Sequence, residues 1–146
     1  MSIYKIYKIS NKIYNMKIPI IPKVIKIFLR LFFGCVIPYT AKIGENTVFG
    51  YQGLGIVIHS RAVIGKNCVI SQGVTLGGTS KKRGVPVIGD NVYIGAGAKI
   101  IGPITIGNNV VIGANSVVIK NVPNNCVIGG VPAKILKRDI NIEDYK

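Results

Sequence analysis

The chain contains one histidine, His59, together with three cysteines and five carboxylates among its 146 residues. Imidazole is the side chain that exchanges protons near neutral pH, so a reaction that needs a histidine acid or base must use His59. The cysteines, Cys35, Cys68 and Cys126, form no CxxC pair, which predicts neither a zinc site nor a disulfide framework. We therefore take His59 as the candidate catalytic residue and expect no bound metal.

Lys and Arg outnumber Asp and Glu by 19 to 5, which gives a formal net charge of +14. Such a charge predicts an acidic partner: nucleic acid, an anionic membrane surface or a phosphorylated small molecule. The basic residues are scattered and no recognised nucleic-acid-binding motif is present, which argues against nucleic acid. No stretch has the roughly 18 apolar residues of a membrane span, and Lys5, Lys8 and Lys12 interrupt any signal-peptide core. We expect a cytoplasmic protein, either soluble or held peripherally at the inner face of the membrane.

Bulky apolar residues recur at intervals of six along most of the chain. A spacing of six does not fit the 3.6-residue period of a helix, and it is typical of a short strand followed by a corner. A glycine usually follows each bulky residue, and glycine suits a tight corner. Three such hexads close one triangular coil, so residues 35–133 are predicted to form an all-β domain, a parallel β-helix of about five coils. The repeating positions are Ile37, Ile43, Phe49, Ile58, Ile64, Ile70, Leu76, Ile88, Ile94, Ile100, Ile106, Ile112 and Val118.

The position two residues before each bulky one holds a small side chain, which must share the crowded interior. All three cysteines occupy this position; Cys126, for example, precedes Ile128 by two residues. The sequence therefore predicts that the cysteines are packing residues rather than redox or nucleophilic groups.

Two interruptions of the six-residue spacing mark segments outside the coils. The step after Phe49 is nine residues, so the segment 51–54 is expected to bulge outward. The step after Leu76 is twelve, and a lysine, Lys82, falls in its middle inward position, where burial would be costly. Residues 78–86 are therefore predicted to form a protruding loop, a place where binding residues are often found.

The phase of the repeat across this loop fixes which residues stack with His59. If the loop keeps the phase, His59 lies in line with Gly77, Gly95 and Gly113. A line of glycines next to the imidazole would leave a groove along one edge of the coils.

The two ends of the chain differ from the repeats. Residues 1–34 carry seven basic and no acidic residues and are predicted to form helices, the second of which begins at Pro22. These helices either cover the open end of the β-helix or lie on an anionic membrane through residues 1–30. At the other end, residues 134–146 are predicted to form a short basic helix and a tail.

Three motifs follow one another along the repeats: VTLGGT at Val74–Thr79, IGAGAKI at Ile94–Ile100 and GVPAK at Gly130–Lys134. In this order they resemble the hexapeptide-repeat acyltransferases, in particular the serine acetyltransferases and related polysaccharide O-acetyltransferases, over about residues 35–138. The resemblance implies a left-handed β-helix and a homotrimer with active sites between neighbouring subunits. It also implies acetyl-CoA as the donor in a direct transfer to an acceptor hydroxyl.

The resemblance assigns roles to individual residues. A base must remove the proton of the acceptor hydroxyl as it attacks the thioester, and His59 is the expected base. Glu45, Asp90 or a backbone carbonyl could orient the ring, although we favour a plain turn role for Asp90. A backbone N–H near Gly77 or Gly78 would stabilise the oxyanion. The expected cofactor-binding residues are Gly77, Gly78, Ala96, Ala114, Lys120, Lys134 and Lys137, and the expected acceptor contacts are Tyr51 and Gln52.

The chain departs from the serine acetyltransferases at several positions. Tyr51 and Gln52 replace an Asp–His pair in the bulge, Val85 replaces a second histidine, and a residue near Val36 replaces an aspartate. Residues 1–34 cannot supply the long helical domain of that family. These differences favour acetyl transfer to a hydroxyl of a sugar or polysaccharide precursor. Serine acetylation, and a non-enzymatic β-helix that binds nucleic acid or a membrane, are the alternatives.

Overall fold

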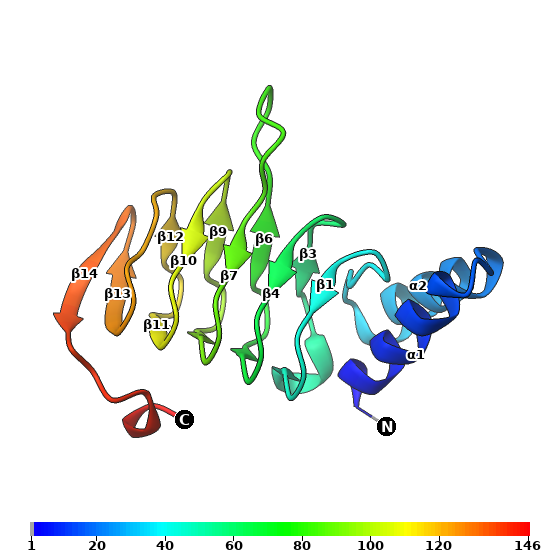
Figure 1. Ribbon diagram of the computed structural model, residues 1–146, viewed down its shortest axis with the longest axis horizontal. Helices are drawn as coiled ribbons and strands as arrows, with labels where there is room; N and C mark the ends of the chain where they lie inside the picture. The colour runs from blue at the N-terminus through cyan, green and yellow to red at the C-terminus, as the bar shows by residue number, and fades with distance from the viewer. Residues whose placement is uncertain (1) are drawn as a thin grey trace.

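The computed structural model describes residues 2–146 as a triangular prism of stacked coils with a pair of helices at one end (Figure 1). Helix α1 (Ile3–Asn15) comes first, followed by α2 (Ile20–Phe33), which begins two residues before the Pro22 start that the sequence predicts. The chain then winds through short strands that form three sheets, one on each face of the prism.

Up to β12, each face collects every third strand of the chain, and β13 and β14 both join the second face. The first face contains β1 (Lys42–Ile43), β4 (Val63–Ile64), β7 (Val87–Ile88) and β10 (Thr105–Ile106). The second face contains β2 (Val48–Phe49), β5 (Val69–Ile70), β8 (Tyr93–Ile94), β11 (Val110–Ile112), β13 (Cys126–Gly130) and β14 (Ala133–Arg138). The third face contains β3 (Val57–Ile58), β6 (Thr75–Gly77), β9 (Lys99–Ile101) and β12 (Val117–Val118).

Within a face, each strand pairs in parallel with the strand one coil further on, apart from β13 and β14. Single bridges from Val36 to Val57 and from Ile106 to Val122 extend the third and first faces by one coil each. Over the described residues 2–146 the prism therefore has five coils, as the six-residue spacing predicts. The architecture is a left-handed parallel β-helix, which confirms the predicted fold class.

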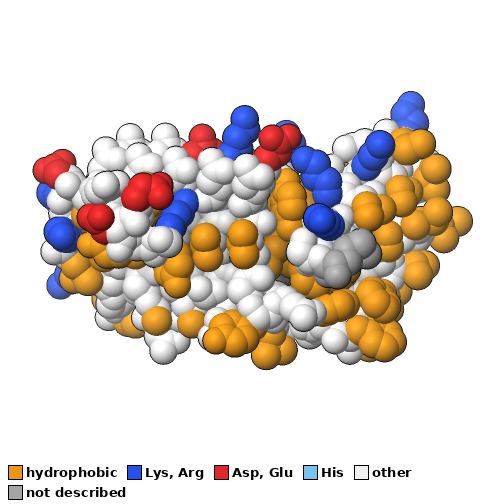
Figure 2. All heavy atoms as spheres, turned by 90° about the horizontal axis from the view of Figure 1, so that it is seen from below, with side chains coloured by type: hydrophobic (Ala, Val, Ile, Leu, Met, Phe, Trp, Pro, Cys, Tyr) orange, Lys and Arg blue, Asp and Glu red, His pale blue; other side chains and the backbone are white. Residues whose placement is uncertain are grey.

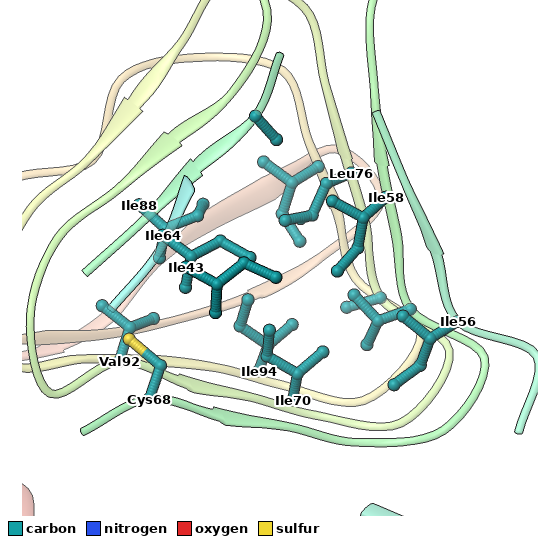
Figure 3. Close-up of a cluster of buried hydrophobic side chains, with 14 of the residues drawn as sticks. Ile43, Ile56, Ile58, Ile64, Cys68, Ile70, Leu76, Ile88, Val92 and Ile94 are labelled. Atoms are coloured by element: carbon teal, nitrogen blue, oxygen red, sulfur yellow. The ribbon is translucent and has the colours of Figure 1, made fainter. Parts of the chain in front are cut away.

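The interior of the prism is filled mainly by isoleucine. Inward side chains of consecutive faces, such as Ile58, Ile64 and Ile70, meet at the centre (Figure 3) and are fully buried. Burying one such side chain contributes about 1.5–3 kcal/mol. Because a single coil leaves these side chains open above and below, it gains this stabilisation only when another coil stacks on it.

The corners between faces demand special backbone conformations. We call the corner between the first and second faces the first corner, that between the second and third faces the second corner, and that between the third and first faces the third corner. An asparagine in the left-handed conformation, with φ between 54° and 58°, occupies the first corner of every coil. Asparagine tolerates this region better than other residues with a Cβ. These residues are Asn46, Asn67, Asn91, Asn109 and Asn125.

A glycine lies two residues before each of these asparagines except Asn125, where the backbones of successive coils approach closely. A Cβ on Gly65 would overlap the carbonyl group of Gly89 in the next coil. The glycines at these corners are therefore explained by the close approach of the backbones of stacked coils.

Residues 78–86 leave the coil and form the loop that rises from the prism in Figure 1. The chain passes from the third face at β6 directly to the first face at β7. The step from Leu76 to Ile88 is therefore six residues longer than the usual six, and the loop accounts for this difference. Gly77 consequently pairs with Ile101. The third corner stacks, in order, His59, Gly77, Ile101 and Ile119. The predicted line of His59 over Gly95 and Gly113 was wrong, because those two glycines lie at the second corner.

The C-terminal helix predicted within residues 134–146 was also wrong, because Ala133–Arg138 form strand β14, antiparallel to β13. Without β14, the edge of β13 would expose unpaired backbone groups. A helix would leave that edge open, and most of this segment is exposed to solvent, so it has no apolar stripe to bury. After β14, a single 3₁₀ turn at Ile142–Asp144 lies in the tail.

Helices α1 and α2 cover the open end of the first coil. The hydroxyl of Tyr7 donates a hydrogen bond to the carbonyl oxygen of Ala41 (2.6 Å) and accepts one from the N–H of Ile43 (3.2 Å). Ile3 of α1 and Leu29 of α2 are buried in the same core as the coils. These contacts support the capping role that the sequence suggests.

We expect Tyr7→Phe to lower the free energy of unfolding by about 1–3 kcal/mol, because the buried N–H of Ile43 would lose its acceptor. Chemical denaturation followed by circular dichroism measures this change. Tyr4→Phe is the matched control, since within residues 2–146 the Tyr4 hydroxyl forms a hydrogen bond only with the exposed Lys8 Nζ (3.5 Å). Equal effects of the two substitutions would contradict a specific role for the Tyr7 hydroxyl.

The three thiols lie in the interior, as the sequence predicts. Cys35, Cys68 and Cys126 are all free and buried. Burial raises the pKa of the Cys35 thiol to about 11 and also raises the pKa of the other two. Their thiolate fraction near neutral pH is therefore small, which suits packing residues.

A thiol reagent that attacks the thiolate, such as 5,5′-dithiobis(2-nitrobenzoate), should react with none of the cysteines of the folded protein near neutral pH. In guanidinium chloride all three should react, because unfolding removes both the burial and the raised pKa. Fast reaction of any thiol before unfolding would show that the interior packing described above is wrong at that position.

Candidate functional site

His59 lies at the third corner, directly after strand β3, and its side chain is partly exposed. Its N–H donates to the carbonyl oxygen of Leu76 (2.8 Å), and its own carbonyl accepts from the N–H of Ala62 (3.0 Å). Because Ile58 points into the core and side chains alternate along a strand, the imidazole points away from the core. The backbone is thus held on both sides of the candidate catalytic residue.

A backbone group orients the imidazole. The N–H of Arg61 donates to Nδ1 of His59 (3.1 Å). A ring nitrogen that accepts a hydrogen bond carries no proton, so this bond assigns the proton of the neutral ring to Nε2. In this orientation Nε2 can donate a hydrogen bond, whereas action as a base requires the ring to turn away from the Arg61 N–H.

Neither of the carboxylates proposed to orient His59 contacts it. Glu45 lies at the first corner and forms an ion pair with Lys8 (3.8 Å). Asp90 lies at the same corner and accepts from the N–H of Lys66 (2.8 Å). The orienting group is instead the Arg61 N–H, which sequence reasoning missed; its only signal is that a polar side chain commonly bonds to the backbone two residues on.

The protruding loop begins beside the imidazole. A Cβ at Gly78 would lie 3.8 Å from Cδ2 of His59 and 3.6 Å from Cγ1 of Val85, on the returning branch of the loop. Gly77 stacks directly on His59 at the corner. Of the predicted cofactor-binding residues, Gly77 and Gly78 are therefore the two that the structure brings next to His59, and their lack of side chains leaves the space there open.

A basic hollow of about 500 Å³ lies at the last coil of the prism and reaches the third corner at Ile119. It is lined by Lys120 and Lys134 together with apolar residues that include Ile119 and Pro132. Ile119 belongs to the same corner stack as His59, three coils away, which corresponds to about 14 Å at the usual strand spacing. Lys137 of β14, in contrast, pairs with Val127 of β13 and does not line the hollow.

The remaining predicted residues lie at the second corner. Tyr51 and Gln52 belong to a 3₁₀ turn at Gly50–Gly53, both in the left-handed conformation, and Tyr51 is 79% exposed. Ala96 and Ala114 follow β8 and β11 at the same corner; Ala96 is partly buried and Ala114 is exposed.

The predicted site is therefore divided within one protomer between two corners of the prism. The third corner carries the imidazole, the two loop glycines and, at the last coil, Lys120, whereas Lys134 of β14 pairs with Gly129 beside the second corner. The second corner carries the expected acceptor contacts and the two alanines. No group of three or more His, Cys, Asp or Glu side chains suited to a metal ion occurs among residues 2–146.

Two family models match the coils. One, described as bacterial transferase hexapeptide (six repeats), matches residues 86–120, and the other, described as hexapeptide repeat of succinyl-transferase, matches residues 55–80. Both stretches lie within the β-helix. They are consistent with the six-residue spacing of the inward side chains.

Known proteins similar to this chain are serine acetyltransferases. The protein from Synechococcus elongatus is 41% identical over 134 residues, and that from Staphylococcus aureus is 48% identical over 133 residues. Each alignment covers 90% of this chain, but only 54% and 62% of the respective relative. The chain thus spans little more than half the length of these relatives.

Solved structures show the same likeness. The serine acetyltransferase of Neisseria gonorrhoeae superposes with a TM-score of 0.88 at 36% identity, covering 95% of this chain and 54% of that one. The serine acetyltransferase of Brucella abortus, solved in complex with coenzyme A, gives a TM-score of 0.87 at 34% identity, covering 92% and 54%. In its repeats, motifs and coils, the chain is thus similar to the hexapeptide-repeat acyltransferases, and in particular to the serine acetyltransferases.

Proposed function

We propose that the protein is an acetyl-CoA-dependent O-acetyltransferase that transfers the acetyl group directly to an acceptor hydroxyl. The observation that carries this proposal is the edge at the third corner, which carries His59 and leads, at the last coil, to the hollow lined by Lys120 and Lys134. A partly exposed imidazole and a cationic hollow on one edge fit a long ligand that is reactive at one end and anionic at the other. The relatives described above support the same reaction.

The residues present fit a bound CoA thioester. The phosphates would lie near Lys120 and Lys134, since ammonium groups form strong hydrogen bonds with phosphate oxygens. The apolar surface of Ile101 and Ile119 between the hollow and His59 suits the thin pantetheine arm, which the absence of side chains at Gly77 and Gly78 leaves free to reach the imidazole. The loop residues Lys81, Lys82 and Arg83 would draw the anionic donor toward this edge.

The division of the site between two corners supports a trimer. Tyr51, Gln52, Ala96 and Ala114 cannot serve the same active site as His59 within one protomer, because they lie at a different corner of a rigid prism. In our proposal the second corner of a neighbouring protomer packs against the third corner of this one. The two alanines would then contact the donor through their backbone, and Tyr51 and Gln52 would contact the acceptor. Lys137, away from the hollow, would contribute only long-range attraction to the phosphates.

In the proposed reaction, the acceptor oxygen attacks the carbonyl carbon of the thioester. The new C–O bond gives a tetrahedral intermediate, the C–S bond then breaks as this intermediate collapses, and the proton of the hydroxyl ends on the thiol of CoA. His59 carries that proton between the two, after its ring releases the N–H of Arg61. A backbone N–H near Gly77 or Gly78 would stabilise the oxyanion of the intermediate.

Serine is the first acceptor to consider, because the relatives described above are serine acetyltransferases. A sugar hydroxyl is the second candidate, and a structural observation favours it. Neither the second nor the third corner carries an Asp or Glu within residues 2–146, so the ammonium group of serine would have no carboxylate partner there from this protomer. The neutral Tyr51 and Gln52 suit an uncharged polyol.

We expect the protein to release CoA thiol from acetyl-CoA at a rate that depends on a hydroxyl-bearing acceptor. The assay measures free thiol with serine and, in parallel, with a panel of sugars and nucleotide sugars. Faster release with serine would assign serine acetylation, and faster release with a sugar would assign the second candidate. If no acceptor raises the rate and the protein does not bind CoA in calorimetry, the proposed function is wrong.

Replacing His59 should separate its possible roles. His59→Ala should lower kcat by about 10²–10⁴-fold, the usual contribution of a general base, without loss of the fold because the ring lies outside the core. His59→Gln keeps an N–H donor near the position of Nε2 but cannot accept the proton. It should therefore be as inactive as His59→Ala.

Substantial activity in His59→Gln, with little in His59→Ala, would show that the ring acts as a hydrogen-bond donor rather than as a base. Full activity in His59→Ala would remove His59 from the mechanism. Thermal unfolding of each variant checks that the lost activity is not lost folding.

A further inference from the structure

Helix α2 has two apolar sides, and only one of them faces the core. The core side buries Pro22 and Leu29. On the opposite side, Ile20, Leu31 and Phe32 are 72%, 75% and 73% exposed. The exposed large apolar residues of the helix are Ile20, Ile21, Val24, Ile27, Phe28, Leu31 and Phe32, which we call the outer face of α2.

The outer face is continuous along the helix. Positions 20, 24, 27 and 31 follow the i, i+4, i+7, i+11 spacing that places side chains on one side of an α-helix. Phe28 and Phe32 extend the same side and contact each other, with ring centroids 4.7 Å apart. Figure 2 shows hydrophobic side chains gathered over the end of the molecule that the helices form. Scattered apolar residues are ordinary on a protein surface, but a continuous apolar face on one helix marks an interaction site.

A row of basic residues runs along one flank of this face. Lys23, Lys26 and Arg30 line a hollow of about 430 Å³ together with Ile27 and Tyr39. All three basic side chains are exposed. The hollow therefore offers three cations to one anionic group, directly beside the apolar side chains of the same helix.

The charge of the surrounding segment has one sign. Residues 2–34 contain seven basic and no acidic side chains. Lys8 alone among them forms an ion pair within the described residues, with Glu45 on the first coil. Any partner of this surface must therefore combine an apolar phase with negative charge.

We propose that α2 docks on the surface of an anionic lipid bilayer. The outer face would lie among the acyl chains near the headgroups, and the hollow formed by Lys23, Lys26 and Arg30 would hold a lipid phosphate. A helix that lies in the interface with an apolar side and a basic flank has this arrangement. Among residues 2–146, neither helix has the length and apolar character of a membrane span, so docking is parallel to the surface.

A second copy of the chain fits the outer face less well. Pairing two copies through α2 would bring the same basic flank of each helix toward the other, and like charges repel. A 14-residue helix is about 21 Å long, which is short for a stable interface that buries about 800 Å² on each partner. A bilayer, in contrast, supplies both the apolar phase and the negative charge.

The position of α2 leaves the candidate active site free. Figure 1 places the helices at one end of the prism, while the loop 78–86 rises from its side and β14 lies at the opposite end. A protein docked through α2 would therefore expose the third corner to the aqueous phase. The docking proposal does not depend on the acetyltransferase assignment, because it rests on other residues.

The test is co-sedimentation of the full chain with phosphatidylcholine vesicles that contain phosphatidylglycerol, and with vesicles of phosphatidylcholine alone. We expect binding to the anionic vesicles, and at least tenfold weaker binding to the neutral ones. Lys23→Gln/Lys26→Gln/Arg30→Gln should weaken anionic-vesicle binding at least tenfold, since each basic residue near such a surface contributes substantially. Val24→Ser/Leu31→Ser should weaken it to a similar extent. Both variants change exposed side chains, so their thermal unfolding should match that of the original chain.

Two controls make the test specific to α2. Lys81→Gln/Lys82→Gln/Arg83→Gln removes the same charge from the loop, and Leu136→Ser removes an exposed apolar side chain from β14. Both should bind anionic vesicles within about twofold of the original chain. An equal loss with the loop variant would show nonspecific charge attraction and overturn the proposal.

The mass of the protein in solution, measured without vesicles by light scattering, addresses the competing occupant. It should be unchanged by Val24→Ser/Leu31→Ser. A lower mass in that variant would show that the outer face joins two copies of the chain and would overturn the proposal. Absence of binding to anionic vesicles by the original chain would overturn it as well.

Discussion

The structure depends on one constraint: a coil can bury its inward side chains only against the coils above and below it. The side chains of Ile58, Ile64 and Ile70 cannot be buried within a single coil. The coil therefore gains the free energy of their burial only when other coils stack on it. Stacking in turn requires that corners approach within backbone contact, which explains the glycines and left-handed asparagines there. It also leaves two open ends, and the chain treats them differently: α1 covers one end through the Tyr7 contacts, and β14 pairs with the exposed edge of β13 at the other.

The coils could be predicted from the sequence because every one of them repeats the same steric demands locally. The C-terminal segment could not, because Ala133–Arg138 is rich in helix-forming residues and its strand exists only by pairing with β13. Pairing with β13 therefore gives this segment a strand conformation, although its residues prefer a helix locally. The phase across the loop failed for a related reason. A twelve-residue step after Leu76 equals two hexads. Lys82 in its middle inward position predicts the loop, but no residue there indicates that the chain returns to the next face rather than to the face after it.

The candidate site shows the same division between local and nonlocal information. The outward direction of His59 could be predicted because it follows from the alternation of one strand. Its orienting partner could not, since the Arg61 N–H is a backbone group that every residue but proline possesses. Glu45 and Asp90 were considered because carboxylates are scarce in this chain, yet the prism holds both of them at a different corner. In a rigid prism the corner on which a residue falls decides what it can reach, and the corner depends on the phase of the coils.

The scarcity of carboxylates has a consequence for the whole surface. Within residues 2–146 the pair between Lys8 and Glu45 is the one salt bridge, so most of the positive charge stands unneutralised by the protein. Two places concentrate it next to apolar surface: the hollow with Lys120 and Lys134, and the flank of α2 with Lys23, Lys26 and Arg30. The first lies near β14 and the second at the opposite end of the prism (Figure 1). Because the stacked coils hold these ends apart, an anionic donor and an anionic bilayer would not compete for the same cations, and each could be bound while the other is in place.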